Sequence, residues 1–553
     1  MALKILAVSA EAFPLAKTGG LGDAVSGLCR CLHAIGAHIT LLLPAYRETT
    51  QHVSGIRQIA RLEGLPGGGS ASLLAGESKE LGLPVYLLKN DALYDRDGIY
   101  ANRDGVEYPD NAFRFSALAQ VAARIGAGIA SVPRPDIVHA HDWHAALTPL
   151  YLKQLRVSDV KTILTLHNIA FQGLFPMGLA QSLSIEPRFC YGDGAEFWGQ
   201  LSFLKAGIRY ADLITAVSRN YAREILTPKF GCGLEGVLSE RRNDLLAIPN
   251  GIDTALWNPQ RDPYLSRHSS FSAEKMVNKT IWKRELQRVF GLTEDRTATV
   301  MVMGSRLTTQ KMADVAACAI PVALDRHPSL QVCILGHGDK DLETALRKVG
   351  ERYAGRCGVQ IGFDEQRAHL LHAGADILLH GSRFEPFGLT PLYALRYGAI
   401  PICSKVGGMV DTIVDPGPDQ PASAMCAATG ILFDGETPND MSVAIGRAMA
   451  LRALPAIWRT MQRNAMNADF SWAETAPAYM RACQALRPDI AVDQIPERLR
   501  AGATTQMFQP AFAKAVLDAA NSSPASDKMG NSRRRRKGTR INTLVFPPEA
   551  SAA

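Results

Sequence analysis

Several features that would place this 553-residue chain in a special class are missing from its sequence. No apolar run approaches the length of a membrane-spanning helix, and the start, MALKILAVSAEAF, lacks the apolar core and cleavage pattern of a secretory signal. The ten cysteines are scattered without a CxxC pair, which argues against a zinc site and against a disulfide framework. We therefore expect a cytoplasmic protein with reduced thiols.

A strong charge of one sign is also absent from most of the chain. The formal net charge is +7, but residues 501–553 contain eight Lys or Arg and three acidic side chains, a net +5 that leaves +2 for the first 500 residues. A nearly neutral body does not indicate a nucleic-acid binder. Residues 487–553 lack periodicity and are rich in Ala, Ser, Asn and Pro, which predicts a largely disordered basic tail.

The rest of the chain alternates short apolar runs with amphipathic helical stretches, which is typical of parallel sheets covered by helices. A chain of this length needs more than one core. We predict an α/β fold with two Rossmann-like, doubly wound domains facing a central cleft. The predicted boundaries are 1–253 and 254–469 for the two domains, 470–486 for a closing helix and 487–553 for the tail. The strand-like runs include 38–44, 84–90, 136–142, 162–168, 213–218, 299–307, 330–338, 359–363, 375–382 and 399–404.

The segment from Lys4 to Asp23 reads KILAVSAEAFPLAKTGGLGD and predicts a strand, a glycine-rich turn and the start of a helix. Such a turn presents backbone N–H groups and a positive helix end to an anion, and Lys17 adds a charge next to Gly19 and Gly20. The spacing fits neither the dinucleotide fingerprint nor a P-loop. On this segment alone, an ordinary turn with a solvated lysine explains the pattern equally well.

Two further clusters follow predicted strands of the second domain. Arg306 and Lys311 come directly after the run TVMVMG, where a planar guanidinium and a mobile ammonium would form an anion clamp. Glu385 lies in the turn HGSRFEPFGLT after another buried run, so it is expected to face the cleft. The N–H groups of Gly388, Leu389 and Thr390 at the next helix start could bind phosphate.

The sequence HAHDWH at 139–144 contains three histidines and an aspartate, a combination that could bind a metal. No cysteine or further carboxylate cluster accompanies them, so we favour contact of Asp142 and Trp143 with a sugar. His167 ends the run TILTLHN and is expected to place one imidazole at the mouth of the cleft.

Together these motifs resemble the bacterial glycogen synthase family, which uses ADP-glucose and includes the plant starch synthases. The resemblance extends from about Lys4 to Leu486. It implies the GT-B architecture and a retaining transfer of glucose from ADP-glucose to the non-reducing end of an α-1,4-glucan. The motifs, in the order of the family, are KTGGLGD, YPDNAFRF, HAHDWHA, LHNIAFQG, QLSFLKAGI, ADLITAVS, IPNGID, SRLTTQK and SRFEPFGLTPLYALRYG.

The resemblance also implies roles for individual residues. Arg306 and Lys311 would neutralise the departing diphosphate, Glu385 would be the essential glutamate, and His167 would contact the glucose. The implied substrate-binding residues are Lys17, Gly19, Gly20, Asp23, Tyr100, Asp142, Trp143, Asn250, Gly388, Leu389 and Thr390. No metal or cofactor is implied if the two cations and the backbone amides neutralise the diphosphate. Neither nucleic acid nor membrane is an implied partner, and the oligomeric state is not indicated.

The sequence departs from the family at a few positions. Met312 replaces the usual Gly, Phe387 the usual Cys and Pro391 a common Gln, while Phe363 stands where an aromatic residue with a hydroxyl is frequent. These changes leave two alternatives open: a weakened paralogue that binds glucan, and a related retaining glucosyltransferase that uses UDP-glucose. Retention of the diphosphate clamp favours an active enzyme, because a binding module does not need one.

Overall fold

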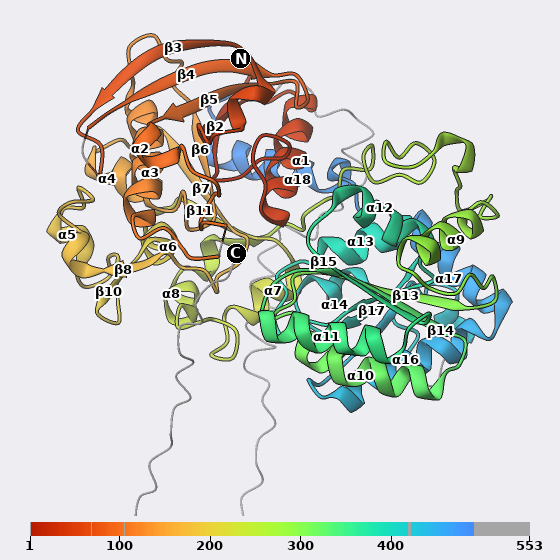
Figure 1. Ribbon diagram of the computed structural model, residues 1–553. Helices are drawn as coiled ribbons and strands as arrows, with labels where there is room; N and C mark the ends of the chain where they lie inside the picture. The colour runs from red at the N-terminus through yellow and green to blue at the C-terminus, as the bar shows by residue number, and fades with distance from the viewer. Residues whose placement is uncertain (1, 68, 104, 419–421, 491–553) are drawn as a thin grey trace, which may run out of the picture.

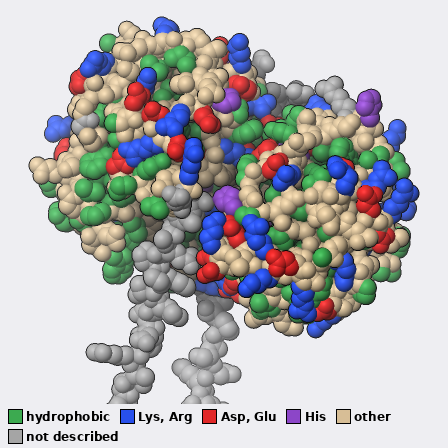
Figure 2. Space-filling model, in the orientation of Figure 1, with side chains coloured by type: hydrophobic (Ala, Val, Ile, Leu, Met, Phe, Trp, Pro, Cys, Tyr) green, Lys and Arg blue, Asp and Glu red, His purple; other side chains and the backbone are tan. Residues whose placement is uncertain are grey.

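The computed structural model describes residues 2–67, 69–103, 105–418 and 422–490, which form two lobes (Figure 1). Figure 2 shows a furrow between these lobes, bordered by side chains of both charge signs. Each lobe contains a largely parallel sheet covered by helices, so the predicted fold class is confirmed. The predicted disordered tail falls almost entirely on residues outside those described. Within the described residues, no helix is both long and apolar enough to cross a bilayer.

The first lobe is built on a nine-stranded sheet in the order β12-β11-β7-β6-β1-β2-β5-β4-β3. All neighbours are parallel except β4, which is antiparallel to both β3 and β5. The central strands are apolar on both faces because helices cover both sides. The strands are β1 (Lys4–Val8), β2 (His38–Pro44), β3 (Val53–Glu63), β4 (Ser70–Ser78), β5 (Leu83–Lys89), β6 (Ile137–His141), β7 (Lys161–Leu166), β11 (Leu213–Ala216) and β12 (Leu245–Ala247).

Helix α1 (Gly20–Ala34) begins immediately after the glycine-rich turn and buries Val25, Leu28 and Leu32, which recur at helical spacing. A small sheet of β8 (Leu174–Pro176), β10 (Gln200–Ser202) and β9 (Glu196–Phe197) lies at the edge of this lobe. The other helices of the lobe are α2 (Asp91–Tyr94), α3 (Asn111–Ala127), α4 (Leu147–Gln154), α5 (Pro187–Cys190), α6 (Phe203–Tyr210), α7 (Arg219–Glu224) and α8 (Glu235–Glu240), with 3-10 turns at Thr49–His52, Met177–Leu179 and Arg242–Asp244.

The second lobe contains a six-stranded parallel sheet in the order β15-β14-β13-β16-β17-β18. Its strands are β13 (Thr299–Gly304), β14 (Leu330–Gly336), β15 (Cys357–Ile361), β16 (Ile377–His380), β17 (Ile400–Ser404) and β18 (Ile431–Phe433). Its helices are α9 (Lys279–Val289), α10 (Ala313–Arg326), α11 (Lys340–Arg352), α12 (Glu365–Gly374), α13 (Leu389–Arg396), α14 (Gly408–Thr412), α15 (Ala422–Met425), α16 (Pro438–Arg452) and α17 (Pro455–Asn467), with a 3-10 turn at Arg267–Ser269.

The last helix, α18 (Trp472–Leu486), returns to the first lobe and packs against α1 (Figure 1). A side-chain carbon on Gly27 would lie 2.0 Å from the indole nitrogen of Trp472, so only glycine permits this close approach. The two segments that pass between the lobes run side by side, and the N–H of Ile252 donates to the carbonyl of Phe470 at 2.8 Å.

Each sheet has one position where the strand order reverses direction. In the first lobe β1 lies between β2 and β6, and in the second lobe β13 lies between β14 and β16. Ligands of open parallel sheets bind at the carboxyl ends of strands flanking such a point. The polar turns after β1, β6, β13 and β16 are therefore the places where a site is expected.

Candidate active site

An ion pair between Lys311 and Glu385 joins the turns that follow β13 and β16. Lys311 Nζ contacts Glu385 Oε2, and both side chains are largely buried. His380 Nε2 lies 3.1 Å from the same carboxylate oxygen and donates to it. Burial alone would raise the pKa of Glu385, but Lys311 and His380 outweigh it and lower that pKa to about 2. The carboxylate is therefore ionised and already paired.

The two turns are held together by Arg383. Its guanidinium binds Asp314 at 2.8 and 2.9 Å, Glu436 at 3.0 Å and the carbonyl of Thr309. The N–H of Arg383 also donates to the carbonyl of Gln310 at 2.9 Å. These bonds explain how Lys311 and Glu385, 74 residues apart in sequence, come into contact.

Arg306 lies at the carboxyl end of β13 with an exposed side chain. The one hydrogen bond of this side chain among the described residues is a long one, 3.4 Å from Nη2 to the amide oxygen of Gln310. The guanidinium therefore keeps most of its donors available for an anion.

Lys17 lies between the two lobes. Its Nζ is 3.1 Å from Asp23 Oδ2 in its own lobe and 3.7 Å from Glu365 Oε2 at the start of α12 in the other. Burial raises the pKa of Asp23 to about 6, although Lys17 opposes that rise. A multiply charged anion entering here would compete with both carboxylates for Lys17.

Glu11 organises the glycine-rich turn and was not anticipated from the sequence. Its buried carboxylate accepts hydrogen bonds from the N–H groups of Thr18 at 2.7 Å and Gly19 at 3.0 Å, and from the Tyr100 hydroxyl at 2.5 Å. The only sequence signal was an acidic residue in an otherwise apolar segment directly after the first strand.

Two helix N-termini converge where the lobes meet. Gly19 caps α1, and Gly388, with φ of +88°, caps α13. A side-chain carbon on Gly20 would lie 3.1 Å from Leu389 Cδ1 of the other lobe, so the two helix starts are close together. The first N–H groups of α13, including those of Leu389 and Thr390, have no partner within their own helix. Helix N-termini attract anions, which makes this junction electropositive.

Asp142 directly follows β6 and has a left-handed backbone conformation, with φ of +60°. Its carboxylate is buried and accepts from the N–H of Trp143 at 3.0 Å. Burial raises the pKa of Asp142 to about 8; the N–H of Trp143 opposes this rise, and the nearby Glu11 carboxylate adds to it. The Trp143 ring packs edge-on against Phe115 at 5.0 Å, so its contact with a sugar stays a prediction.

Three further predicted residues have distinct surroundings. The Tyr100 ring stacks on His144 at 4.7 Å, beside its hydrogen bond to Glu11. The Asn250 side chain is buried, and its oxygen has no hydrogen-bond partner among the described residues. His167 lies at the end of β7, with Nε2 at 3.1 Å from Nδ1 of His141.

The histidine-rich segment is not arranged as a metal site. His139 Nε2 is bonded to Thr165 Oγ1 at 2.6 Å, and His141 is bonded to His167. Across the described ranges, no group of three or more His, Cys, Asp or Glu side chains could hold a metal ion. Asp95 and Asp97, which form a D-x-D sequence, both bind Arg47.

The two departures nearest to the clamp are accommodated by packing. Met312 is fully buried, its sulfur accepts from the Ser404 hydroxyl at 3.4 Å, and its φ of +53° places it in the left-handed region. Phe387 is also buried, and a side-chain carbon on Gly408 would lie 2.8 Å from its ring. Both side chains therefore fill the core under the site.

The left-handed backbone of Met312 gives a prediction about stability. Met312→Ala and Met312→Gly both lose a buried side chain, which costs about 2–5 kcal/mol. Glycine alone removes the left-handed strain, about 1–2 kcal/mol. Urea unfolding is therefore expected to rank wild type above Met312→Gly, and Met312→Gly above Met312→Ala. An alanine variant as stable as the glycine variant would show that this backbone conformation is wrong.

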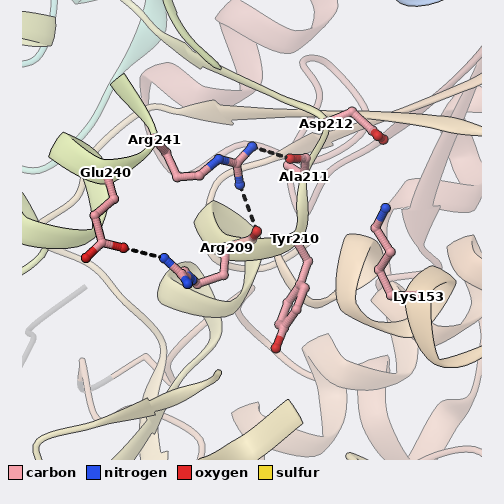
Figure 3. Close-up of a pocket in the computed structure, with 7 residues that line it drawn as sticks. All are labelled: Lys153, Arg209, Tyr210, Ala211, Asp212, Glu240 and Arg241. Atoms are coloured by element: carbon pink, nitrogen blue, oxygen red, sulfur yellow. Dashed lines mark hydrogen bonds and ion pairs between the residues drawn. The ribbon is translucent and has the colours of Figure 1, made fainter. Parts of the chain in front are cut away.

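A separate cavity of about 520 Å³ lies at the end of α6, and none of the residues that line it was predicted to form the site (Figure 3). It is lined by Lys153, Arg209, Tyr210, Ala211, Asp212, Glu240 and Arg241. Its two arginines are already bonded within the protein: Arg209 to Glu240, and Arg241 to the carbonyls of Arg209 and Ala211. These arginines are therefore already satisfied without a ligand.

Comparison with known proteins identifies the family. Residues 4–240 match the starch synthase catalytic domain, and residues 285–465 match glycosyl transferases group 1. The chain is 55% identical to a glycogen synthase of Bordetella petrii over 93% of this chain and 97% of that protein. It is 46% identical to one of Ralstonia nicotianae over 100% of this chain and 99% of that protein.

A solved structure has the same architecture. The catalytic domain of starch synthase IV from Arabidopsis thaliana, bound to ADP and acarbose, matches with a TM-score of 0.79 at 27% identity, covering 88% of this chain and 99% of that one. A sucrose-phosphate synthase from Thermosynechococcus elongatus, 17% identical with a TM-score of 0.54, shares the fold. The resemblance seen in the sequence is confirmed: this chain belongs to the glycogen and starch synthase family of GT-B glycosyltransferases.

Proposed function

We propose that this protein transfers glucose from ADP-glucose to the non-reducing end of an α-1,4-glucan with retention of configuration. The observation that supports this most strongly is the pair of cations Arg306 and Lys311 after β13, at the switch point of one lobe, together with Lys17, which reaches Glu365 of that lobe from the other. Relatives named glycogen synthase and the ADP in the starch synthase structure support the donor and the acceptor.

Charge stabilisation is the main catalytic role that we assign to these groups. Breaking the bond between the anomeric carbon and the diphosphate builds negative charge on the leaving group. Arg306, Lys311 and the N–H groups at the start of α13 are positioned to stabilise that charge, usually the largest single contribution to such a reaction. In the first lobe, the turn at Gly19 and Gly20 would let the backbone approach the same diphosphate closely, while the N–H of Gly19 stays bonded to Glu11. Lys17 would leave Asp23 and Glu365 and bind this diphosphate.

The sugar would be bound from the first lobe, by His167 and Asp142 with Tyr100, Trp143 and Asn250 around them. Glu385 is ionised and held by Lys311 and His380, so we assign it to positioning the lysine rather than to covalent attack. In the step proposed, the bond from the anomeric carbon to the phosphate oxygen breaks and the bond to the acceptor oxygen forms on the same face. The acceptor proton passes to the leaving phosphate.

Glucose incorporation into glycogen from ADP-glucose and UDP-glucose, measured side by side with EDTA present, tests this proposal. We expect strong incorporation from ADP-glucose and weak incorporation from UDP-glucose. Incorporation from UDP-glucose alone would establish the related transferase instead. Incorporation from neither donor, in folded protein that still binds glycogen, would establish the binding paralogue. We place the protein in the cytoplasm, where its ten free thiols would stay reduced.

A further inference from the structure

The imidazole rings of His141 and His167 are hydrogen-bonded to each other at the carboxyl ends of β6 and β7. The strands are parallel neighbours, and His141 Nδ1 lies 3.1 Å from His167 Nε2. The His141 ring is fully buried, whereas His167 is half-buried. Burial lowers the pKa of both rings, that of His167 to about 3. Both imidazoles are therefore neutral near pH 7, and a single proton lies between the two nitrogens.

The other nitrogen of His141 indicates which ring donates that proton. His141 Nε2 is buried and has no hydrogen-bond partner among the described residues. A buried N–H without an acceptor is rarer in proteins than a buried acceptor without a donor. The proton of His141 therefore belongs on Nδ1, which donates to His167 Nε2. His167 must then have its own proton on Nδ1.

The His141 ring is prevented from turning by its neighbours. The His139 ring lies 4.1 Å from it, centroid to centroid, and is itself held by the 2.6 Å bond from Nε2 to Thr165 Oγ1. Thr165 Oγ1 is also 2.7 Å from Thr215 Oγ1 on the next strand. These three hydrogen-bonded side chains, His139, Thr165 and Thr215, lie in the core of the sheet, and the His139 ring packs against the His141 ring.

We propose that His141 is a positioning residue that holds His167 as the Nδ1–H tautomer, so that His167 donates a hydrogen bond to an oxygen of the transferred glucose. The inference rests on the proposed function for the identity of that oxygen. His167 Nδ1 has no hydrogen bond to any described residue, so this donor is free for the substrate. A histidine in the opposite tautomer would present only a lone pair there.

Two nearly isosteric variants separate hydrogen bonding from packing. In His141→Asn the amide nitrogen takes the place of Nδ1 as a donor, whereas His141→Leu has a similar shape and no donor. We expect kcat of the asparagine variant to stay within about 3-fold of wild type and kcat of the leucine variant to fall about 10–100-fold. The KM for the donor and the unfolding midpoint of the two variants are expected to be similar. Equal kcat values in both variants would overturn the positioning role.

The tautomer is measured directly, without turnover, by nitrogen NMR of wild-type protein labelled with ¹⁵N-histidine. The His167 signals are assigned as those missing in His167→Gln. We expect a protonated Nδ1 and an unprotonated Nε2. A proton on Nε2, or a charged ring, would overturn the inference. A wild-type protein with the expected tautomer and no glucosyl transfer would contradict the proposed function and leave the tautomer assignment standing.

Discussion

Lys311→Ala is expected to lower kcat about 10³-fold while the protein stays folded, because it removes a largely buried cation that we propose stabilises the leaving diphosphate. Glu385→Ala is expected to lose most turnover as well, since Lys311 then loses the carboxylate that positions it. Steady-state kinetics with ADP-glucose and glycogen measure both effects. Turnover close to wild type in either variant would contradict the roles assigned to this pair.

Measurements of unfolding stability distinguish a loss of catalysis in these variants from a loss of folding. Removing Lys311 alone leaves the Glu385 carboxylate buried without its cation, which costs about 3–5 kcal/mol. The double variant Lys311→Met with Glu385→Gln leaves neither charge, so it is expected to recover most of that stability and none of the turnover. A double variant that regains activity would show that the single variants failed through folding.

The same pair predicts a pH dependence of stability. The folded state lowers the pKa of Glu385 from 4.5 to about 2, so the stabilisation is complete above pH 4.5 and disappears as the pH falls towards 2. The difference in unfolding free energy between wild type and Lys311→Ala is therefore expected to shrink between pH 5 and pH 3. A difference that is constant over this range would show that the ion pair does not account for it.

Arg306→Ala is expected to lower kcat/KM for ADP-glucose about 10²-fold without changing the unfolding midpoint. The side chain is exposed, and its only bond within the described residues is long, so its removal leaves no buried group unpaired. Arg306→Lys is expected to recover part of the loss, because an ammonium keeps the charge and loses the planar fork.

Arg347→Ala is the matched control for Arg306. Arg347 is an exposed arginine on α11 of the same lobe, so its substitution makes the same change in net charge away from the clamp. Its kinetics are expected to equal those of wild type. An equal loss in both arginine variants would mean that the lobe acts through its total charge, and the specific role of Arg306 would be wrong.

Much of the fold could be predicted because its signals are local. Apolar runs such as those of β1 and β13 are short, buried and followed by glycine or polar turns, so they indicate both the strands and the edge of the sheet where a site lies. The position of Arg306 and Lys311 directly after a buried strand was enough to suggest an anion clamp. The resemblance to the glycogen synthase family then predicted the reaction.

The remaining features depend on contacts between distant segments. Glu11 looks like an ordinary acidic residue until the turn at Thr18 and Gly19 folds onto it. The bond between His141 and His167 requires the register of two neighbouring strands. Nothing local indicates that Lys17 pairs with Glu365 across the lobes, or that Met312 adopts a left-handed backbone, because both result from how the finished domains pack.

The most direct test of the proposed reaction is the NMR spectrum of the first product formed from ADP-glucose labelled with ¹³C at the anomeric carbon, with a maltooligosaccharide as acceptor. The proposal predicts one new labelled residue at the non-reducing end, in the α configuration and linked through oxygen 4. A β-linked product would contradict retention and the same-face step. Labelled free glucose without any oligosaccharide product would contradict transfer to a glucan.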